Sequence, residues 1–204
     1  MRGKRLKRYF YTQPTLKVAQ NLLGKFLVRK IGKKMLSGMI VEVEAYKGHS
    51  DKASHASRGK TKRTEVMFDK AGLAYVYIIY GMYHCLNVVT EREEYPSAVL
   101  IRSLEPVQFL APVSRYPKPK TQHLTNGPGK LCQAFKIDRK LNKLDLVTSD
   151  KLWIEDRGVK IKQSQIVRTK RIGVDYAGPY WSKRKWRFYI KNNRFVSIKE
   201  KRDD

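Results

Sequence analysis

A chain of 204 residues with 41% hydrophobic content can bury a core in one domain or two small ones, which excludes general disorder. Lys and Arg number 44 against 18 Asp and Glu, so the formal net charge is +26. This excess favours a polyanionic partner, of which nucleic acid is the commonest. A membrane is the weaker alternative, because no apolar run approaches the ~20 residues of a spanning helix.

The N-terminal part combines a basic segment with a short helix. Residues 1–10 are strongly basic, and we expect them to form a flexible arm ahead of a single domain over residues 11–204. Pro14 suits the first turn of a helix, apolar residues follow at helical spacing, and Gly24 ends that helix.

Two strands are expected next, over residues 25–30 and 35–46. Side chains alternate between the two faces of a strand, so Glu42, Glu44 and Tyr46 share one face near the end of the second strand. A polar loop follows.

Residues 74–89 have the pattern of a β-hairpin, because β-branched, aromatic and apolar runs flank Gly81, which can adopt the positive φ of a tight turn. The tip is unusual, since it presents Tyr80, Met82 and Tyr83 where turns usually carry small polar residues. Such side chains must be covered by the protein's own core, by a partner chain or by base pairs.

Strands dominate the remainder of the chain. A strand is expected over residues 98–104 and a loop over 106–124, and Gly127–Lys130 either forms a backbone nest for a phosphate or simply begins a short helix. Further strands are expected over 152–155, 171–174, 186–190 and 195–198. The pattern predicts an α+β fold: a single domain with a curved, mainly antiparallel β-sheet, peripheral helices and a protruding β-hairpin.

Glu44 is the candidate for acid–base chemistry. It lies beside Tyr46, just before the polar loop of residues 48–62 that holds His55, and a carboxylate at the mouth of an aromatic pocket can act as a general base. The alternative is that Glu44 pairs with a surface arginine, and Glu42 on the same face is the substitute candidate.

No metal or other cofactor is expected. Four histidines and two cysteines have no compact ligand spacing, and Gly127–Lys130 lacks the spacing of a phosphate-binding P-loop. Cys85 and Cys132 fall in apolar stretches and are expected to be buried free thiols of a reducing compartment. Nothing has the pattern of a signal peptide, so we expect a bacterial cytoplasmic protein, or a nuclear one if the source is eukaryotic.

Tyrosines gather around the hairpin and the carboxylate, which in a very basic domain suggests stacking on a nucleobase. Packing is the alternative, because tyrosines in strands usually pack. The tyrosines are Tyr46, Tyr75, Tyr77, Tyr80 and Tyr83.

Taken together, eight segments in order resemble the alkyladenine (3-methyladenine) DNA glycosylase family. The resemblance extends from about Leu16 to Ser197, and it is carried by Val41–Tyr46, Asp51–His55, Arg63–Phe68, Tyr75–Met82, Cys85–Val88, Val99–Arg102, Asn126–Cys132 and Trp186–Tyr189.

The resemblance implies a monofunctional glycosylase that flips a damaged purine out of duplex DNA and hydrolyses its N-glycosidic bond. Glu44 would then activate the attacking water, with Arg102 helping to hold that water. Tyr46 would stack on one face of the base, and His55 and Tyr77 on the other.

The resemblance also implies roles for the residues of the hairpin. Tyr80 would fill the gap left in the duplex, with Met82 and Tyr83 lining the minor groove, while Asn87 would form the pocket floor and obstruct normal guanine. A simple two-residue turn would not place Tyr77 and Asn87 in one pocket, so a bulge or a longer loop is required.

The expected partner is double-stranded DNA that contains a damaged purine, such as 3-methyladenine or 7-methylguanine, and the expected state is a monomer. Two alternatives are a helix-hairpin-helix glycosylase, suggested by Gly127–Gly129 but needing a mostly helical chain, and a non-enzymatic basic nucleic-acid-binding protein.

Overall fold

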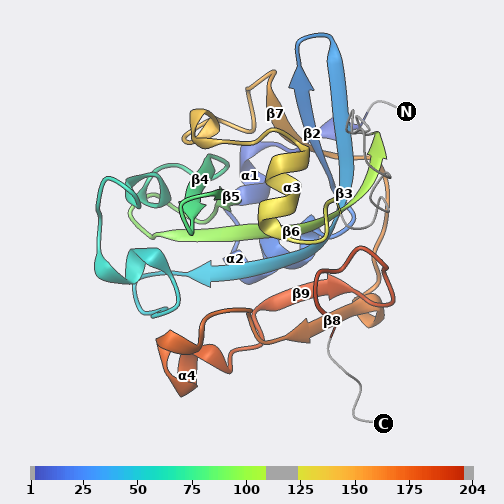
Figure 1. Ribbon diagram of the computed structural model, residues 1–204. Coiled ribbons are helices and arrows are strands. Elements are labelled where there is room, and N and C mark those ends of the chain that lie inside the picture. Colours follow the sequence, from blue (N-terminus) through green and yellow to red (C-terminus); the bar gives the residue numbers. More distant parts are fainter. Residues whose placement is uncertain (1–2, 109–123, 200–204) are drawn as a thin grey trace.

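The computed structural model describes residues 3–108 and 124–199, and within those residues nine strands form one antiparallel sheet (Figure 1). Neighbouring strands follow the order β1-β7-β2-β3-β6-β5-β4, while β9 pairs with β3 and β8. The strands are β1 Lys4–Arg5, β2 Phe26–Ile31, β3 Lys34–Lys47, β4 Ala74–Ile79, β5 Tyr83–Val89, β6 Ser97–Gln108, β7 Leu152–Asp156, β8 Ile166–Thr169 and β9 Arg187–Ile190.

Short helices surround this sheet. α2 packs on β3, and α3 packs on β5 and β6. Together with the protruding hairpin, this arrangement confirms the predicted α+β class. The helices in the described part of the chain are α1 Arg8–Tyr11, α2 Thr15–Leu22, α3 Pro128–Ala134 and α4 Pro179–Ser182, with 3-10 turns at His55–Arg58, Glu65–Phe68, Arg139–Leu141, Gln163–Gln165 and Asp175–Ala177. Across residues 3–108 and 124–199, no helix is long and apolar enough to cross a membrane.

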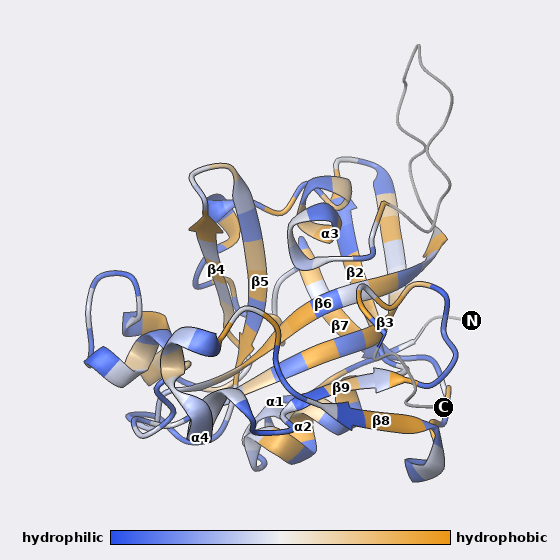
Figure 2. Cartoon of the chain, turned by 60° about the horizontal axis from the view of Figure 1, so that its bottom comes forward, coloured by the Kyte–Doolittle hydropathy of each residue, from blue (hydrophilic) through white to orange (hydrophobic). Residues whose placement is uncertain are grey.

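The central strand of the fold is β3. Its first half pairs with β2, most of its length pairs with β6, and residues 42–44 also pair with β9. Ile40, Val41 and Val43 are fully buried, because other elements cover both faces of the strand here. Figure 2 shows the hydrophobic stretches along β3 and β6. Irregular pairing with β6 around Glu42 interrupts the alternation near the two carboxylates.

The β4–β5 hairpin has a three-residue loop, because Ile79 pairs with Tyr83. This loop supplies the extra residue that the sequence required. Tyr77 therefore lies opposite Cys85, and Tyr75 lies opposite Asn87, so these four side chains share one face. Tyr80 has a φ of 52° and Gly81 a φ of 69°, so both adopt the left-handed conformation that turns the chain.

The described part of segment 1–10 is folded rather than a flexible arm. Lys4–Arg5 form β1 on the edge of β7, and Arg8 begins α1. Arg8 also forms an ion pair with Asp145 and donates a hydrogen bond to the carbonyl oxygen of Ala71. These long-range contacts hold a segment that its charge alone suggests is loose.

Two of the strands expected near the C-terminus do not form, namely 171–174 and 195–198. Their backbone groups bind side chains instead of a neighbouring strand: the amide of Ile172 donates to Glu44, and the amide of Ser197 donates to Glu42. β8 forms where no strand is expected, and its last two residues belong to a basic run over residues 168–171. Of the loop expected over 106–124, the first three residues belong to β6, and residues 109–123 lie outside the described ranges.

Candidate active site

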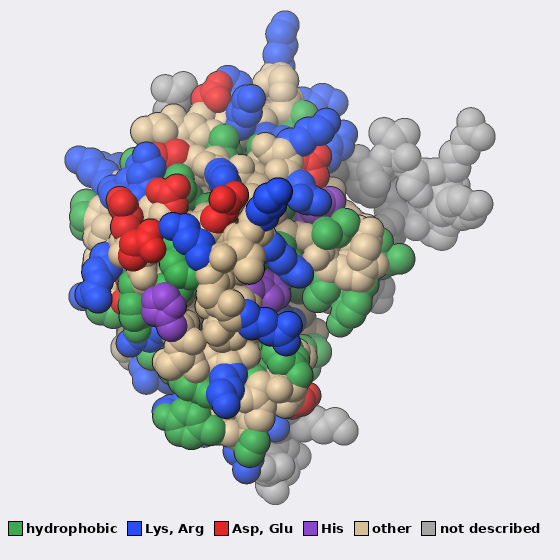
Figure 3. Space-filling view, turned by 90° about the vertical axis from the view of Figure 1, so that its left-hand side faces the viewer, with side chains coloured by type: hydrophobic (Ala, Val, Ile, Leu, Met, Phe, Trp, Pro, Cys, Tyr) green, Lys and Arg blue, Asp and Glu red, His purple; other side chains and the backbone are tan. Residues whose placement is uncertain are grey.

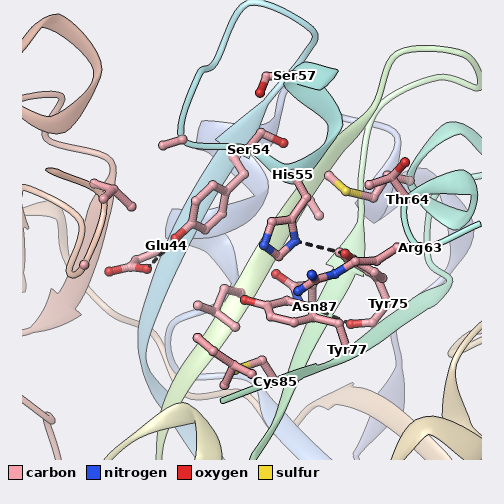
Figure 4. Close-up of a pocket in the computed structure, with 18 of the residues that line it drawn as sticks. Glu44, Ser54, His55, Ser57, Arg63, Thr64, Tyr75, Tyr77, Cys85 and Asn87 are labelled. Carbon is pink, nitrogen blue, oxygen red and sulfur yellow. Dashed lines mark hydrogen bonds between the residues drawn. The ribbon is translucent and has the colours of Figure 1, made fainter. Parts of the chain in front are cut away.

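A cavity of about 820 Å³ opens between the end of β3 and the β4–β5 hairpin. Residues of the 52–64 segment and of the 172–176 segment complete its wall. Figure 4 shows Glu44 on one side, with His55, Tyr75 and Tyr77 grouped on the other. The cavity is lined by every predicted catalytic and base-pocket residue and by one tip residue: Glu44, Tyr46, His55, Tyr77, Asn87, Arg102 and Tyr80.

Glu44 is fully buried and belongs to the lining of this cavity. Its Oε1 accepts a hydrogen bond from the Ile172 amide at 2.8 Å, and its Oε2 accepts one from the Tyr46 hydroxyl at 2.9 Å. Arg102 Nη1 lies 3.2 Å from the same Oε2. Three donors therefore fix the orientation of this carboxylate.

Glu42, two residues earlier, is occupied by structural contacts and does not line the cavity. It accepts hydrogen bonds from Arg102 Nε at 3.0 Å, from Arg187 Nη1 at 2.9 Å and from the Ser197 amide at 2.7 Å. Burial alone would raise the pKa of Glu42, but Arg102 and the bonds from Ser197 and Arg187 lower it below its ordinary value. Of the two carboxylates, Glu44 is thus the one that can meet a substrate.

The aromatic wall is built from the 3-10 turn at His55 and from β4. The rings of His55 and Tyr77 meet edge to face, with centroids 4.6 Å apart, and the Tyr75 and Tyr77 centroids are 5.2 Å apart. The Arg63 guanidinium lies 5.1 Å from the centre of the Tyr77 ring. These contacts lock the rings in place at the side of the cavity.

His55 is neutral at neutral pH. Burial, followed by the charges of Arg63 and Arg58, lowers the pKa of His55 to about 4. Its Nδ1 lies 3.0 Å from the Tyr75 hydroxyl, which orients the imidazole ring. A neutral ring does not repel a cationic ligand in the cavity.

Asn87 is a buried polar side chain on β5. Its Nδ2 donates a hydrogen bond to the carbonyl oxygen of Tyr75 at 3.2 Å. Because this contact spans the paired strands, the amide group is held in one orientation against the cavity.

The hairpin tip is strongly exposed. Tyr80 is 83% exposed and Met82 64%, so the tip is not buried in the protein's own core. Tyr83 lies lower and is 37% exposed, and it packs against Gly129, where a Cβ would meet its ring at 3.1 Å. The glycine therefore allows α3 to support the hairpin from behind.

Comparison with known proteins decides the family. The sequence model of the methylpurine-DNA glycosylase family matches residues 9–194, which is most of the chain. The chain belongs to the methylpurine-DNA glycosylase family. Members of this family are hydrolases of the N-glycosyl bond that act on DNA in base excision repair, so the resemblance inferred from the sequence is confirmed, and the non-enzymatic alternative is set aside.

Relatives from bacteria and archaea support this membership. A protein of Methanocella arvoryzae is 52% identical over 94% of this chain and 95% of its own length. A protein of Clostridium perfringens is 47% identical over 96% of this chain and its full length, and one of Legionella pneumophila is 48% identical over 95% and 98%. Each carries the name "Putative 3-methyladenine DNA glycosylase".

Some residues of this methylpurine-DNA glycosylase cavity were not singled out from the sequence. The Ile172 amide binds Glu44 from 128 residues away, and a backbone donor leaves no signal in the sequence. Arg63 and Cys85 also line the cavity. Both lie within segments that carry the family resemblance, which was the available signal. Cys85 and Cys132 are buried free thiols, as predicted.

The charge of the protein surface is compatible with the DNA substrates of the family. Figure 3 shows Lys and Arg side chains distributed over the face on the hairpin side, with several acidic side chains together at the upper left and others scattered. The formal net charge of +26 supplies the long-range attraction to phosphate.

Proposed function

We propose that this protein flips an alkylated purine out of duplex DNA and hydrolyses its N-glycosidic bond with a water that Glu44 activates, leaving an abasic site. The proposed substrates are 3-methyladenine and 7-methylguanine, with hypoxanthine and ethenoadenine as further bases to test. The observation that carries the proposal is a buried, oriented carboxylate, Glu44, facing a cavity large enough for a base.

Glu44 has room for one water molecule in its hydrogen-bonding shell. A carboxylate offers about four acceptor positions. Within the described residues, Oε2 accepts from Tyr46 and lies beside Arg102, while Oε1 accepts from the Ile172 amide. The remaining position on Oε1 can accept a proton from a water aimed at C1′, and Arg102, which lines the cavity, is proposed to help hold that water.

The chemistry needs only modest base strength. Alkylation at N3 or N7 leaves the purine positively charged, so it departs readily and positive charge develops on the sugar. A nearby carboxylate stabilises an oxocarbenium-like transition state, as in the hydrolysis of sugars. Glu44 therefore acts by charge and by directing water.

The cavity walls are proposed to select the base. Tyr46 would stack on one face, and His55 and Tyr77 on the other, where electron-rich rings favour a cationic purine. The fixed amide of Asn87 would clash with, or leave unpaired, the exocyclic amino group of normal guanine, which is worth about 1–3 kcal/mol of discrimination. 7-Methylguanine carries the same group, and the stacking of its cationic ring on the aromatic walls is proposed to offset that cost.

The exposed tip is proposed to replace the flipped nucleotide in the duplex. Tyr80 would enter the base stack, while Met82 and Tyr83 contact the minor groove. Unstacking a base costs a few kcal/mol, and it costs least for a damaged base, so the lesion assists its own extrusion.

The test compares two carboxylate variants on methylated DNA, with release of free methylpurine as the readout. Glu44→Gln should abolish release and retain binding to the duplex, because it removes the charge but keeps the shape. Glu42→Gln should instead lower the thermal stability, because it leaves buried arginines without their partner. Full activity of Glu44→Gln would refute the assignment. Borohydride should trap no protein–DNA adduct, since water rather than a lysine is the proposed nucleophile.

A further inference from the structure

A buried ion pair lies directly behind the cavity. Arg171 and Asp51 are both fully buried in their side chains and form two contacts, with Nη1–Oδ2 at 2.5 Å and Nη2–Oδ1 at 2.9 Å. Neither residue lines the cavity. Taking an arginine and a carboxylate out of water is costly, and removing one partner of such a pair leaves the other charge buried and unpaired.

Arg171 contacts the strand that carries Glu44 and Tyr46. Its Nη1 donates a hydrogen bond to the carbonyl oxygen of Ala45 at 3.0 Å, between those two residues. Its guanidinium carbon lies over the Tyr46 ring, 4.8 Å from the ring centre, and over the Trp186 ring, 5.1 Å from its centre. The next residue along the chain, Ile172, places its amide on Glu44.

Asp51 connects the same ion pair to the segment that carries His55. Its carboxylate accepts hydrogen bonds from the amides of Lys47 at 3.2 Å and Ala53 at 3.1 Å, and its carbonyl oxygen accepts one from the Ser54 amide at 2.8 Å. These bonds fix the path of the chain from the end of β3 to the turn that begins at His55.

We propose that the Asp51–Arg171 pair is the positioning unit of the active site. The pair fixes the relative positions of three groups: the Tyr46 ring, the Ile172 amide that binds Glu44, and the first residue of the His55 turn. The inference rests on the proposed function of Glu44. A lysine in place of Arg171 keeps the charge but loses both the two-point contact with Asp51 and the flat surface that stacks on Tyr46.

The test separates the chemical step from DNA binding. Arg171→Lys is compared with the wild type in single-turnover release of 7-methylguanine at saturating enzyme, and in the Kd for a duplex with a tetrahydrofuran abasic analogue. The analogue places no base in the cavity. The rate should fall about 10- to 100-fold, because small displacements of catalytic groups have effects of this size. The Kd for the analogue should stay within about threefold, because the hairpin and the basic surface are unchanged.

The matched control is Arg157→Lys. Arg157 also pairs with a carboxylate, Glu155, at 2.7 Å and lies over an aromatic ring, Phe26, at 4.5 Å, but it does not line or adjoin the cavity. The control should leave the single-turnover rate unchanged. A rate loss in the control equal to that in Arg171→Lys would show a general effect of stability and would overturn the inference.

A double variant tests the same inference in case Arg171→Lys alone loses activity because it does not fold. Asp51→Asn combined with Arg171→Met leaves no unpaired buried ion, so it should fold and still show the loss of rate with a normal Kd for the analogue. Asp51→Asn and Arg171→Lys together should lose no more rate than the worse single variant, because both act through one unit. A fully active double variant refutes the positioning role, whereas a wild type that releases no methylpurine refutes the proposed function itself.

Discussion

Glu42 and Glu44 carry the same functional group two residues apart on β3, yet their surroundings give them different tasks. Glu42 is occupied by Arg102, Arg187 and Ser197 and holds the C-terminal segment to the sheet. Glu44 keeps one side toward the cavity. The partners of a carboxylate, rather than its position in a strand pattern, decide whether it can reach a substrate.

At the same scale, His55 makes stability depend on pH. The ordinary pKa of 6.5 applies to the unfolded chain, and the folded pKa is about 4. Between these values the unfolded chain binds a proton that the folded protein does not, so the free energy of unfolding should fall as pH decreases from 6.5 to 4. The contribution is about 2 kcal/mol, after allowance for partial exposure.

Chemical denaturation across this pH range should therefore show a shallower pH dependence for His55→Asn than for the wild type. His84→Asn, on the adjoining strand β5 and outside the cavity lining, is the control for the loss of a histidine side chain as such. Equal slopes for His55→Asn and the wild type would contradict the assignment of the proton to His55.

Among the elements, the β4–β5 hairpin contributes both to the exposed surface, through its tip, and to the cavity wall, through its strands. Its three-residue loop sets the register that brings Tyr75, Tyr77 and Asn87 to one face. The same loop carries the exposed Tyr80. One turn geometry thus determines both which side chains project from the protein surface and which side chains line the cavity.

Tyr80→Ala should weaken binding to a duplex with a methylated purine by about 5- to 100-fold, as expected for the loss of ~1–3 kcal/mol of stacking. The melting temperature should not change, because the side chain is 83% exposed. Tyr9→Ala removes another exposed tyrosine, 69% exposed on α1, and should leave both binding and melting unaltered. Comparable losses of binding in the two variants would argue against a specific role for the tip.

The local sequence pattern was sufficient to predict some secondary-structure elements but not others. The hairpin, α2, β2 and β3 were predictable from periodicity and glycine punctuation. The length of the hairpin loop was not, because Tyr80 adopts a conformation that favours glycine. The Asp51–Arg171 pair joins residues 120 positions apart, and no spacing rule brings such a pair together. Glu44 was preferred over Glu42 from its place beside Tyr46, just before the loop that holds His55, and then through the family resemblance. The structure supplies the physical reason.

For the molecule as a whole, charge should govern binding to undamaged DNA. If the basic surface neutralises about 6–10 phosphates, raising salt from roughly 50 to 200 mM should reduce affinity by on the order of 10³–10⁵. The single-turnover rate at saturating enzyme should change little, because Glu44 and its hydrogen-bond donors are buried and so little screened by salt. Titration of binding against salt measures the slope, and a flat response would exclude the basic surface as the DNA footprint.

The backbone conformation of Tyr80 raises the question of why a tyrosine stands at this position. A non-glycine residue at a φ of 52° carries a cost of about 1–3 kcal/mol, and its exposed ring adds nothing to the core. Selection for thermal stability alone should therefore replace this tyrosine with glycine or asparagine. Its presence therefore indicates a requirement at this position other than the stability of the free protein, and the proposed entry of Tyr80 into the base stack would be such a requirement.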